Sequence, residues 1–412
     1  MTSSEVYRTL DEALASGAGL ADPFPLYHRL REEEPVQWSQ ILHGWIVTRY
    51  ADVTAGFHDD RLSSDRISQL GMQMQAMGIE PSILTDYARA FGGSMVMKDP
   101  PEHTRLRRTA RGGFMQGAID SWRPLIQQVA DEIVEGVAGA ARMDIVAELG
   151  RPLSLGVMSA LFGIEQGFRA RFQRWSEDLA DFFGGTFGDV NEAARAANEG
   201  ARALNTHFKW LVEARRSAPG DDLVSLILRD AEEGQIDVDV LCSQCVTILA
   251  AGHVTTVDQS SNSLHALLSH RDELEKVRQD PSLIPSAIRE TLRFDPAGPF
   301  VHRVATTDLE IAGQPIQKGQ LVFLGMAAAN RDPREFPDPD RFDVTRQVNR
   351  HVTFGQGPHA CLGAGLARVT LEVVLATLLR RLPDLRLDPG RPPRVRHQSA
   401  VFRGHHELPV LF

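Results

Sequence analysis

The alternation of apolar and polar positions predicts a mainly helical chain that also contains a few short strands. Helical periodicity at the N-terminus passes into Trp38–Tyr50, where Trp45–Thr48 is rich in strand-forming residues. Residues 115–235 follow a helical pattern over most of their length, and residues 236–270 predict a largely apolar helix. No internal repeat or Pro/Gly/Ser-rich linker interrupts the pattern. One large domain spanning residues 1–412 is therefore predicted.

The stretch from residue 61 to residue 98 lacks a regular pattern and is rich in methionine. Because methionine more often fills a core than contacts a ligand, core packing is the first interpretation of these side chains. The methionines concerned are Met72, Met74, Met77, Met95 and Met97.

Composition narrows the class of protein. The formal net charge of -10 argues against nucleic acid as a partner, since phosphate binding needs a basic surface. Three cysteines do not make a disulfide framework, which favours a reducing compartment. The longest uninterrupted apolar runs, such as Leu321–Asn330, fall short of the roughly 18 residues of a membrane span. The polar N-terminus lacks the pattern of a leader. We expect a cytoplasmic monomer that binds neither nucleic acid nor a membrane.

Two of the cysteines, Cys242 and Cys245, form a CxxC pair within the apolar helix pattern. Such a pair can be a redox centre or half of a zinc site. A zinc site needs two further ligands, and the sequence contains no second CxxC and no HxxxH. We interpret both side chains as core residues.

The third cysteine, Cys361, lies in the glycine-rich stretch Phe354–Arg368, just ahead of a helical pattern. Glycines allow positive φ angles and close approach of the backbone to a ligand. The N–H groups and dipole of a helix N-terminus favour the thiolate, which is the metal-binding form. A buried structural cysteine is the plain alternative. A dinucleotide loop at Gly355–Ala360 is a second alternative, but the acidic residue that it needs about 20 positions later is missing.

The whole stretch reads Phe-Gly-x-Gly-x-His-x-Cys-x-Gly-x-x-Leu-Ala-Arg. It resembles the haem loop of the cytochrome P450 family at every fixed position. The resemblance implies a mainly α fold with small β-sheets, and haem b with Cys361 as the axial ligand of its iron. It also implies that Phe354, Gly355 and Gly363 shape the loop around the haem.

A second motif, His103-x-x-x-Arg107, lies on a predicted helix that Asp99 caps and the Gly112-Gly113 pair ends. Residues four apart share one helix face. By the resemblance, His103 and Arg107 bind the haem propionates, as do two later residues, Arg303 and His359. A separate basic stripe on the same helix is either a solvated face or a docking patch for an acidic electron donor; it consists of Arg105, Arg108 and Arg111.

Small residues interrupt the apolar helix at Leu249–Thr256, which usually indicates close helix packing. The family carries Ala-Gly-x-acid-Thr in its distal helix. By this resemblance Gly252 makes room for dioxygen and Thr255 hydrogen-bonds the bound oxygen. The acid is replaced by Val254, which cannot relay a proton, so the usual proton route is in doubt. The neighbouring His253 points about 100° away along a helix and does not take over that role.

The pair Glu290 and Arg293 is spaced to share one helix face. Together with Arg341, some 50 residues later, it resembles the family's structural triad. Such a triad braces the loop that carries Cys361.

The substrate pocket is the least determined part of the sequence. The segment 297–302 is expected to be extended, with Gly298 and Phe300 facing the pocket. The family resemblance adds a C-terminal wall that contains Val401 and Phe402, and Ala251 on the distal helix. Nothing in these positions identifies the substrate.

The resemblance implies a monooxygenase that activates dioxygen and hydroxylates a small organic molecule, most simply in secondary metabolism. A separate ferredoxin and ferredoxin reductase would supply electrons, and the substrate is either free or attached to a carrier protein. One alternative is an oxidase that couples or cyclises its substrate without oxygen insertion, which the replacement by Val254 keeps open. Another is a haem-containing sensor, although Thr255 favours oxygen activation and the sequence shows no output domain.

Overall fold

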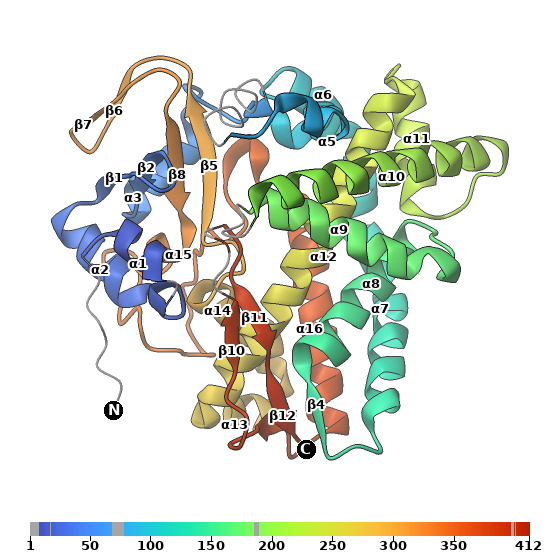
Figure 1. Ribbon diagram of the computed structural model, residues 1–412. Helices are drawn as coiled ribbons and strands as arrows, with labels where there is room; N and C mark the ends of the chain where they lie inside the picture. The colour runs from blue at the N-terminus through green and yellow to red at the C-terminus, as the bar shows by residue number, and fades with distance from the viewer. Residues whose placement is uncertain (1–7, 17, 68–77, 185–188, 397–398, 400) are drawn as a thin grey trace. The chain divides into compact units, whose positions relative to one another are not determined.

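A computed structural model describes residues 8–16, 18–67, 78–184, 189–396, 399 and 401–412 (Figure 1). The chain divides into two compact units. Unit 1 comprises residues 1–63, 258–361 and 384–411, and unit 2 comprises residues 64–257 and 362–383 with residue 412. The chain passes from unit 2 to unit 1 within helix α12 (Val238–Ser269). A single domain over residues 1–412 stays a prediction.

Unit 1 is built on a five-stranded sheet with the order β1-β2-β8-β5-β3. Strands β2 and β8 are parallel, and the other neighbours are antiparallel. The predicted strand at Trp45–Thr48 is confirmed as β2. Gly44 is required at its start, because a Cβ atom there would lie 2.7 Å from the ring of Phe323. The strands are β1 (Val36–Ser39), β2 (Gly44–Val47), β3 (Leu62–Ser63), β5 (Phe300–Ala305) and β8 (Leu321–Gly325).

Successive side chains of a strand point to opposite faces of the sheet. Ile46 and Phe323 accordingly enter one hydrophobic cluster, while their neighbours Val47 and Leu324 enter another. Helices α1 (Leu10–Ser16), α2 (Phe24–Glu33), α3 (Tyr50–His58) and α15 (Met326–Ala329) add further residues to these clusters. Unit 1 also contains α13 (Arg271–Gln279) and α14 (Ile284–Phe294). Its short strands are β6 (Leu309–Ile311), β7 (Gln314–Ile316), β9 (Arg386–Leu387), β10 (Arg394–Arg396), β11 (Gly404–Glu407) and β12 (Pro409–Leu411).

Unit 2 is mainly helical, as the pattern over residues 115–235 predicts. Within it α9 packs along α10, and α16 packs along α7. The helices are α5 (Thr85–Gly92), α6 (Glu102–Arg111), α7 (Gln116–Val137), α8 (Arg151–Leu161), α9 (Arg169–Phe183), α10 (Val190–Ser217), α11 (Leu223–Glu233), the first part of α12, and α16 (Ala364–Arg381); β4 spans Arg142–Asp144.

The start of α6 differs from the prediction. Its N-cap is Pro101, with no side-chain cap, and Asp99 instead accepts a hydrogen bond from the backbone N–H of Ser64 at 2.8 Å. Asp99 is therefore wrong as the capping residue, because its carboxylate binds the preceding segment of unit 2. The predicted end is confirmed, since α6 stops at Arg111.

The methionine-rich stretch is described only in part. Met95 and Met97 are buried, which confirms the core interpretation for these two. Met72, Met74 and Met77 lie outside the described residues.

Helix α12 is long and apolar enough to cross a membrane by length and composition alone, with a mean hydropathy of 1.5 over its best 18-residue window. Polar residues are scattered along α12, so its sequence contains no uninterrupted apolar run of that length. Within the structure 67% of that window is buried, which is typical of a helix in a protein core.

Candidate active site

The loop that carries Cys361 is held by its own backbone. Gly355 and Gly357 have φ angles of 63° and 69°, which favour glycine. A Cβ atom on Gly357 would also lie 2.8 Å from the carbonyl oxygen of Phe57. The N–H of Cys361 donates to the carbonyl of Phe354 at 2.8 Å. The side chain of Cys361 is exposed, three residues before α16 begins.

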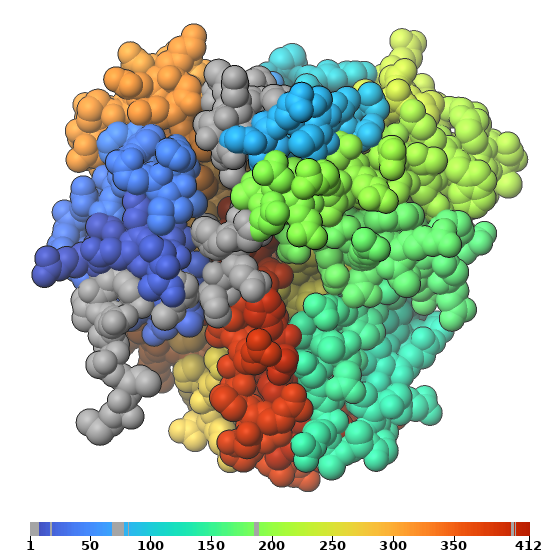
Figure 2. Space-filling view, viewed as in Figure 1, coloured from blue at the N-terminus to red at the C-terminus, as the bar shows by residue number. Residues whose placement is uncertain are grey.

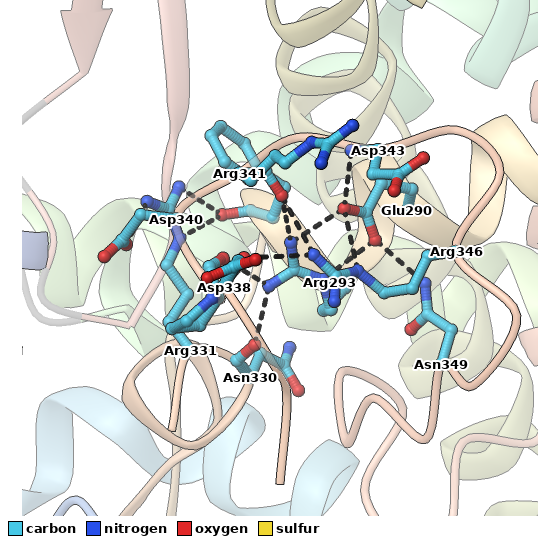
Figure 3. A network of polar contacts seen from close by, with 12 residues as sticks. Glu290, Arg293, Asn330, Arg331, Asp338, Asp340, Arg341, Asp343, Arg346 and Asn349 are labelled. Atoms are coloured by element: carbon cyan, nitrogen blue, oxygen red, sulfur yellow. Dashed lines mark hydrogen bonds and ion pairs between the residues drawn. The ribbon is translucent and has the colours of Figure 1, made fainter. Parts of the chain in front are cut away.

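A buried ion pair lies behind this loop within unit 1 (Figure 3). Arg293 and Glu290 are both 0% exposed, and the guanidinium binds the carboxylate in two places, at 2.8 Å and 2.7 Å. Arg293 also donates to the carbonyls of Asn330 and Pro339 at 2.9 Å and 2.7 Å. Bidentate geometry and these carbonyls satisfy the donors of a guanidinium that would otherwise be costly to bury.

The third member of the predicted triad is wrong. Arg341 contributes only its backbone carbonyl, which accepts from Arg293 at 3.2 Å, while its side chain is exposed. The arginine whose side chain reaches Glu290 is Arg346, at 3.3 Å, and Asn349 binds the second carboxylate oxygen at 3.0 Å (Figure 3). The chain turns between the two arginines, with the N–H of Arg346 donating to the carbonyl of Asp343 at 3.1 Å, and motif spacing does not encode this turn.

Asn330 connects the buried pair to the cysteine loop. Its side-chain oxygen accepts from the N–H of Val352 at 2.8 Å, and its amide donates to the hydroxyl of Thr353 at 2.9 Å. Thr353 in turn donates to the carbonyl of Leu292 in α14 at 2.7 Å. Helix α14 is thereby linked to the two residues that precede Phe354.

The predicted propionate-binding residues come from both units. In unit 1, Arg303 is buried in β5 and donates to the carbonyl of His302 at 3.0 Å, and His359 is half-buried in the cysteine loop. In unit 2, His103 and Arg107 lie one turn apart on α6, the first buried and the second half-buried. Each pair provides positive or hydrogen-bonding groups suited to carboxylates.

Several residues in the middle of α12 are not buried, although most of the helix is. Ala251 is exposed, and Thr255 is half-buried with its hydroxyl donating to the carbonyl of Ala251 at 2.5 Å. Gly252 lies against α8, since a Cβ atom there would be 2.7 Å from the terminal methyl of Met158. Gly252 thus allows α8 and α12 to pack closely, as small residues in a helix usually do.

Val254 and His253 are both buried in unit 2. The Nδ1 atom of His253 lies 3.1 Å from the hydroxyl of Ser154 in α8, and Nε2 lies 3.9 Å from the carboxylate of Glu177 in α9. Burial raises the pKa of Glu177, but the nearby imidazole of His253, the hydrogen bond from Gln173 and the guanidinium of Arg151 outweigh it, and the pKa is lowered overall. His253 is thus engaged with α8 and α9, a contact that no sequence signal indicated.

The predicted pocket residues differ in burial. Gly298, Val401 and Phe402 are half-buried. Phe300 is only 4% exposed, because its ring packs edge-on against Tyr27 with centroids 5.8 Å apart. The ring of Phe300 therefore packs in a hydrophobic cluster of unit 1.

Cys242 and Cys245 are fully buried, which confirms them as core residues. Burial raises the pKa of the Cys242 thiol to about 12. Among the residues that the structure describes, no group of three His, Cys, Asp or Glu side chains is placed to hold a metal ion.

A family model described as Cytochrome P450 matches residues 67–405. The chain belongs to the cytochrome P450 family. It is 36% identical over 420 residues to cytochrome P450 107B1 of Saccharopolyspora erythraea, covering 100% of this chain and 99% of the relative. It is 35% identical over 407 residues to the 6-deoxyerythronolide B hydroxylase of the same organism, with 96% and 98% covered. The crystal structure of P450BioI with hexadec-9Z-enoic acid ligated acyl carrier protein matches with a TM-score of 0.88 at 32% identity, covering 97% of this chain and 100% of that one.

These likenesses confirm the mainly helical P450 fold and make the protein a P450 monooxygenase with haem iron as cofactor. The residues present fit that cofactor. Cys361 offers an exposed thiol from a glycine-rich loop whose neighbours Phe354 and Gly355 are half-buried. The arginine and histidine side chains at the predicted propionate-binding positions can donate hydrogen bonds to carboxylates.

Proposed function

We propose that the Cys361 thiolate is the axial ligand of haem b and that the enzyme activates dioxygen to hydroxylate a small organic substrate. The exposed Cys361 thiol, on a loop fixed by Gly355 and Gly357, is the observation that carries this proposal. A thiolate-ligated haem supplies the oxidising chemistry, because the thiolate favours O–O cleavage. The protein orients the substrate and controls access of water and protons.

The haem-facing roles follow from residue chemistry. His103, Arg107, Arg303 and His359 would bind the propionates through charge-assisted hydrogen bonds. A Cβ atom on Gly363 would lie 4.0 Å from the ring of Phe114, an ordinary contact distance. The loop can thus approach a flat ligand closely at this position.

Proton delivery is the step in which this chain differs from its family. The hydroxyl of Thr255 donates to Ala251 and keeps its lone pairs for another donor. Val254 carries no proton, and His253 is directed at Ser154 and Glu177. We infer that protons reach Thr255 from water or from polar groups of the substrate.

Electrons would come from a separate ferredoxin and its reductase. Within the proposed docking stripe on α6, Arg105 forms an ion pair with Glu102 at 2.8 Å. Arg108 and Arg111 are exposed and are the two positions left to bind an acidic donor. The names of the relatives support a secondary-metabolite substrate, and the complex of P450BioI with a carrier protein supports a carrier-bound form as an alternative to a free one. A cytoplasmic location belongs to the same proposal.

The replacement by Val254 favours one second candidate, an oxidase that couples or cyclises its substrate. In that reaction the substrate would lose two hydrogen atoms and close a new bond, and both atoms of dioxygen would leave as water with two electrons and two protons from the donor system and solvent. The haem would supply the oxidising chemistry. Product analysis with labelled dioxygen separates the two reactions, since only hydroxylation retains the label.

The carbon monoxide difference spectrum of the reduced holoprotein tests the ligand assignment. We expect the red-shifted band of a thiolate ligand, and its loss in Cys361→Ser. Cys242→Ala is the matched control and should keep the band, because Cys242 is buried in the core. Retention of the band in Cys361→Ser would refute the assignment. Turnover with a surrogate ferredoxin then separates an enzyme from a sensor.

A further inference from the structure

The second half of α12 carries six consecutive polar residues, Asp258-Gln-Ser-Ser-Asn-Ser263, and all six are buried. Leaving one such group without a partner costs about 1–3 kcal/mol. A helix that only had to pack against a core would be more stable with apolar residues here. The partners of these side chains therefore indicate what the polar run does.

Two amides of the run bind one loop of unit 1. The side-chain oxygen of Gln259 accepts from the N–H of Ala297 at 2.9 Å, and its amide donates to the carbonyl of Asp295 at 3.3 Å. Asn262 donates to the same carbonyl at 3.3 Å and to the carbonyl of Arg403 at 3.0 Å. The two side chains thus hold residues 295–297 and residue 403 together against α12.

A direct link joins those two segments to each other. The Nε atom of Arg403 donates to the carboxylate of Asp295 at 2.6 Å, and both side chains are nearly buried. The backbone N–H of Arg403 donates to the carbonyl of Ala297 at 2.8 Å. The amides and the ion pair close a ring of contacts around Ala297.

The C-terminal hairpin is fixed to the same helix further along. Asp258 forms an ion pair with Arg396 of β10, and Ser261 lies 3.2 Å from Nδ1 of His405 in β11. The C-terminal segment, red in Figure 2, forms a continuous surface on the face shown there. Polar contacts thus attach both strands of the hairpin to α12.

We propose that Gln259, Asn262, Asp295 and Arg403, here called the α12 clamp, are positioning residues that set the width of the substrate pocket. Ala297 directly precedes Gly298 in one predicted pocket wall. Arg403 directly follows Val401 and Phe402 in the other. The clamp therefore holds both predicted walls at their ends. Directional hydrogen bonds hold the two walls in one register, whereas apolar contacts of equal area would let them slide. The inference rests on the proposed function, since the walls matter only if this pocket binds substrate.

The experiment compares a small and a bulky nitrogen ligand of haem iron. Gln259→Leu and Asn262→Leu each remove clamp contacts at nearly constant volume. Ser261→Ala is the matched control, because Ser261 belongs to the same buried run but its hydroxyl bonds to the carbonyl of Asp258 at 2.9 Å and lies 3.2 Å from Nδ1 of His405. The ferric holoprotein is titrated with imidazole and with phenylimidazole, and the shift of the haem absorption gives each Kd.

Imidazole carries no substituent beyond the ring that binds iron, so its Kd should stay within about twofold in every variant. The Kd of phenylimidazole should change by about tenfold in both Leu variants, as expected for the loss of a net hydrogen bond. In Ser261→Ala the ratio of the two Kd values should remain that of the unsubstituted protein.

An unchanged ratio in both Leu variants at normal haem content would overturn the clamp. An equal shift in Ser261→Ala would overturn it too, because that result would indicate general loosening of α12. Hydrogen exchange of the unsubstituted holoprotein provides a test that needs no variant. The amides of Ala297 and Arg403 should exchange slowly, and fast exchange at both would also overturn the clamp. Failure of the proposed function looks different, because the unsubstituted protein would then lack the thiolate spectrum.

Discussion

Replacing Arg346 should weaken the fold far more than replacing Arg341. Arg346→Ala removes the charge-assisted bond to Glu290 at 3.3 Å and the hydrogen bonds to the carbonyls of Pro337 and Asp338 at 2.8 Å and 3.1 Å. Glu290 keeps Arg293 as its main partner, so the loss of stability is smaller than for a fully broken buried pair. We expect Arg346→Ala to lower the free energy of unfolding by about 3 kcal/mol. Arg341→Ala removes only an exposed side chain and should cost less than about 0.5 kcal/mol.

Thermal unfolding of the holoprotein, followed by haem absorbance and by circular dichroism, measures both variants. With an unfolding entropy of about 2.1 cal/mol/K per residue over 412 residues, a loss of about 3 kcal/mol lowers Tm by about 3–4 °C. Haem should also dissociate faster from Arg346→Ala, because Asn330 links the same network to residues 352–353 before the cysteine loop. Equal Tm values for the two variants, or a larger loss in Arg341→Ala, would refute the assignment of Arg346.

Three further perturbations test other parts of the molecule. Val254→Glu restores an acid beside Thr255 and should lower peroxide release per NADPH consumed; unchanged release and product ratio would argue against a proton-limited site. Burial lowers the pKa of His405 to about 3, so between about pH 6.5 and 3 the unfolded chain binds the additional proton and stability falls as pH falls. From pH 7 to pH 5, denaturant titration should show His405→Phe losing about 2 kcal/mol less than the unsubstituted protein, and parallel losses would contradict this. Gly44→Ala places a methyl group 2.7 Å from the Phe323 ring and should cost about 1–3 kcal/mol; an unchanged midpoint of urea unfolding would show that the ring moves aside freely.

The sequence allowed the fold and the cysteine loop to be predicted because both are encoded locally. A glycine pattern followed by a helical pattern specifies a loop with positive φ angles ahead of a helix, and the structure has that arrangement at Gly355, Gly357 and α16. The buried pair of Glu290 and Arg293 was also accessible, since residues three apart on a helix face each other.

The errors concern side chains whose partners are remote in sequence. Arg341 and Arg346 lie in irregular backbone, where direction follows from tertiary packing and not from a period. Asp99 reads as a helix cap because capping is a local rule, yet its carboxylate binds Ser64, 35 positions earlier. The contact of His253 with Glu177 likewise depends on how α9 packs on α12 within unit 2, which no local pattern expresses.

The side chain of Arg403 also binds the carbonyl of Leu20 at 2.6 Å, across 383 positions of the chain. During synthesis, therefore, unit 1 cannot be completed until Arg403 has left the ribosome. Residues 64–257 of unit 2 form one continuous stretch and can begin to fold much earlier. A nascent chain arrested before Arg403 would leave Asn262 and Asp295 without their contacts to Arg403. Such a chain would expose this polar run of α12 to chaperones and proteases.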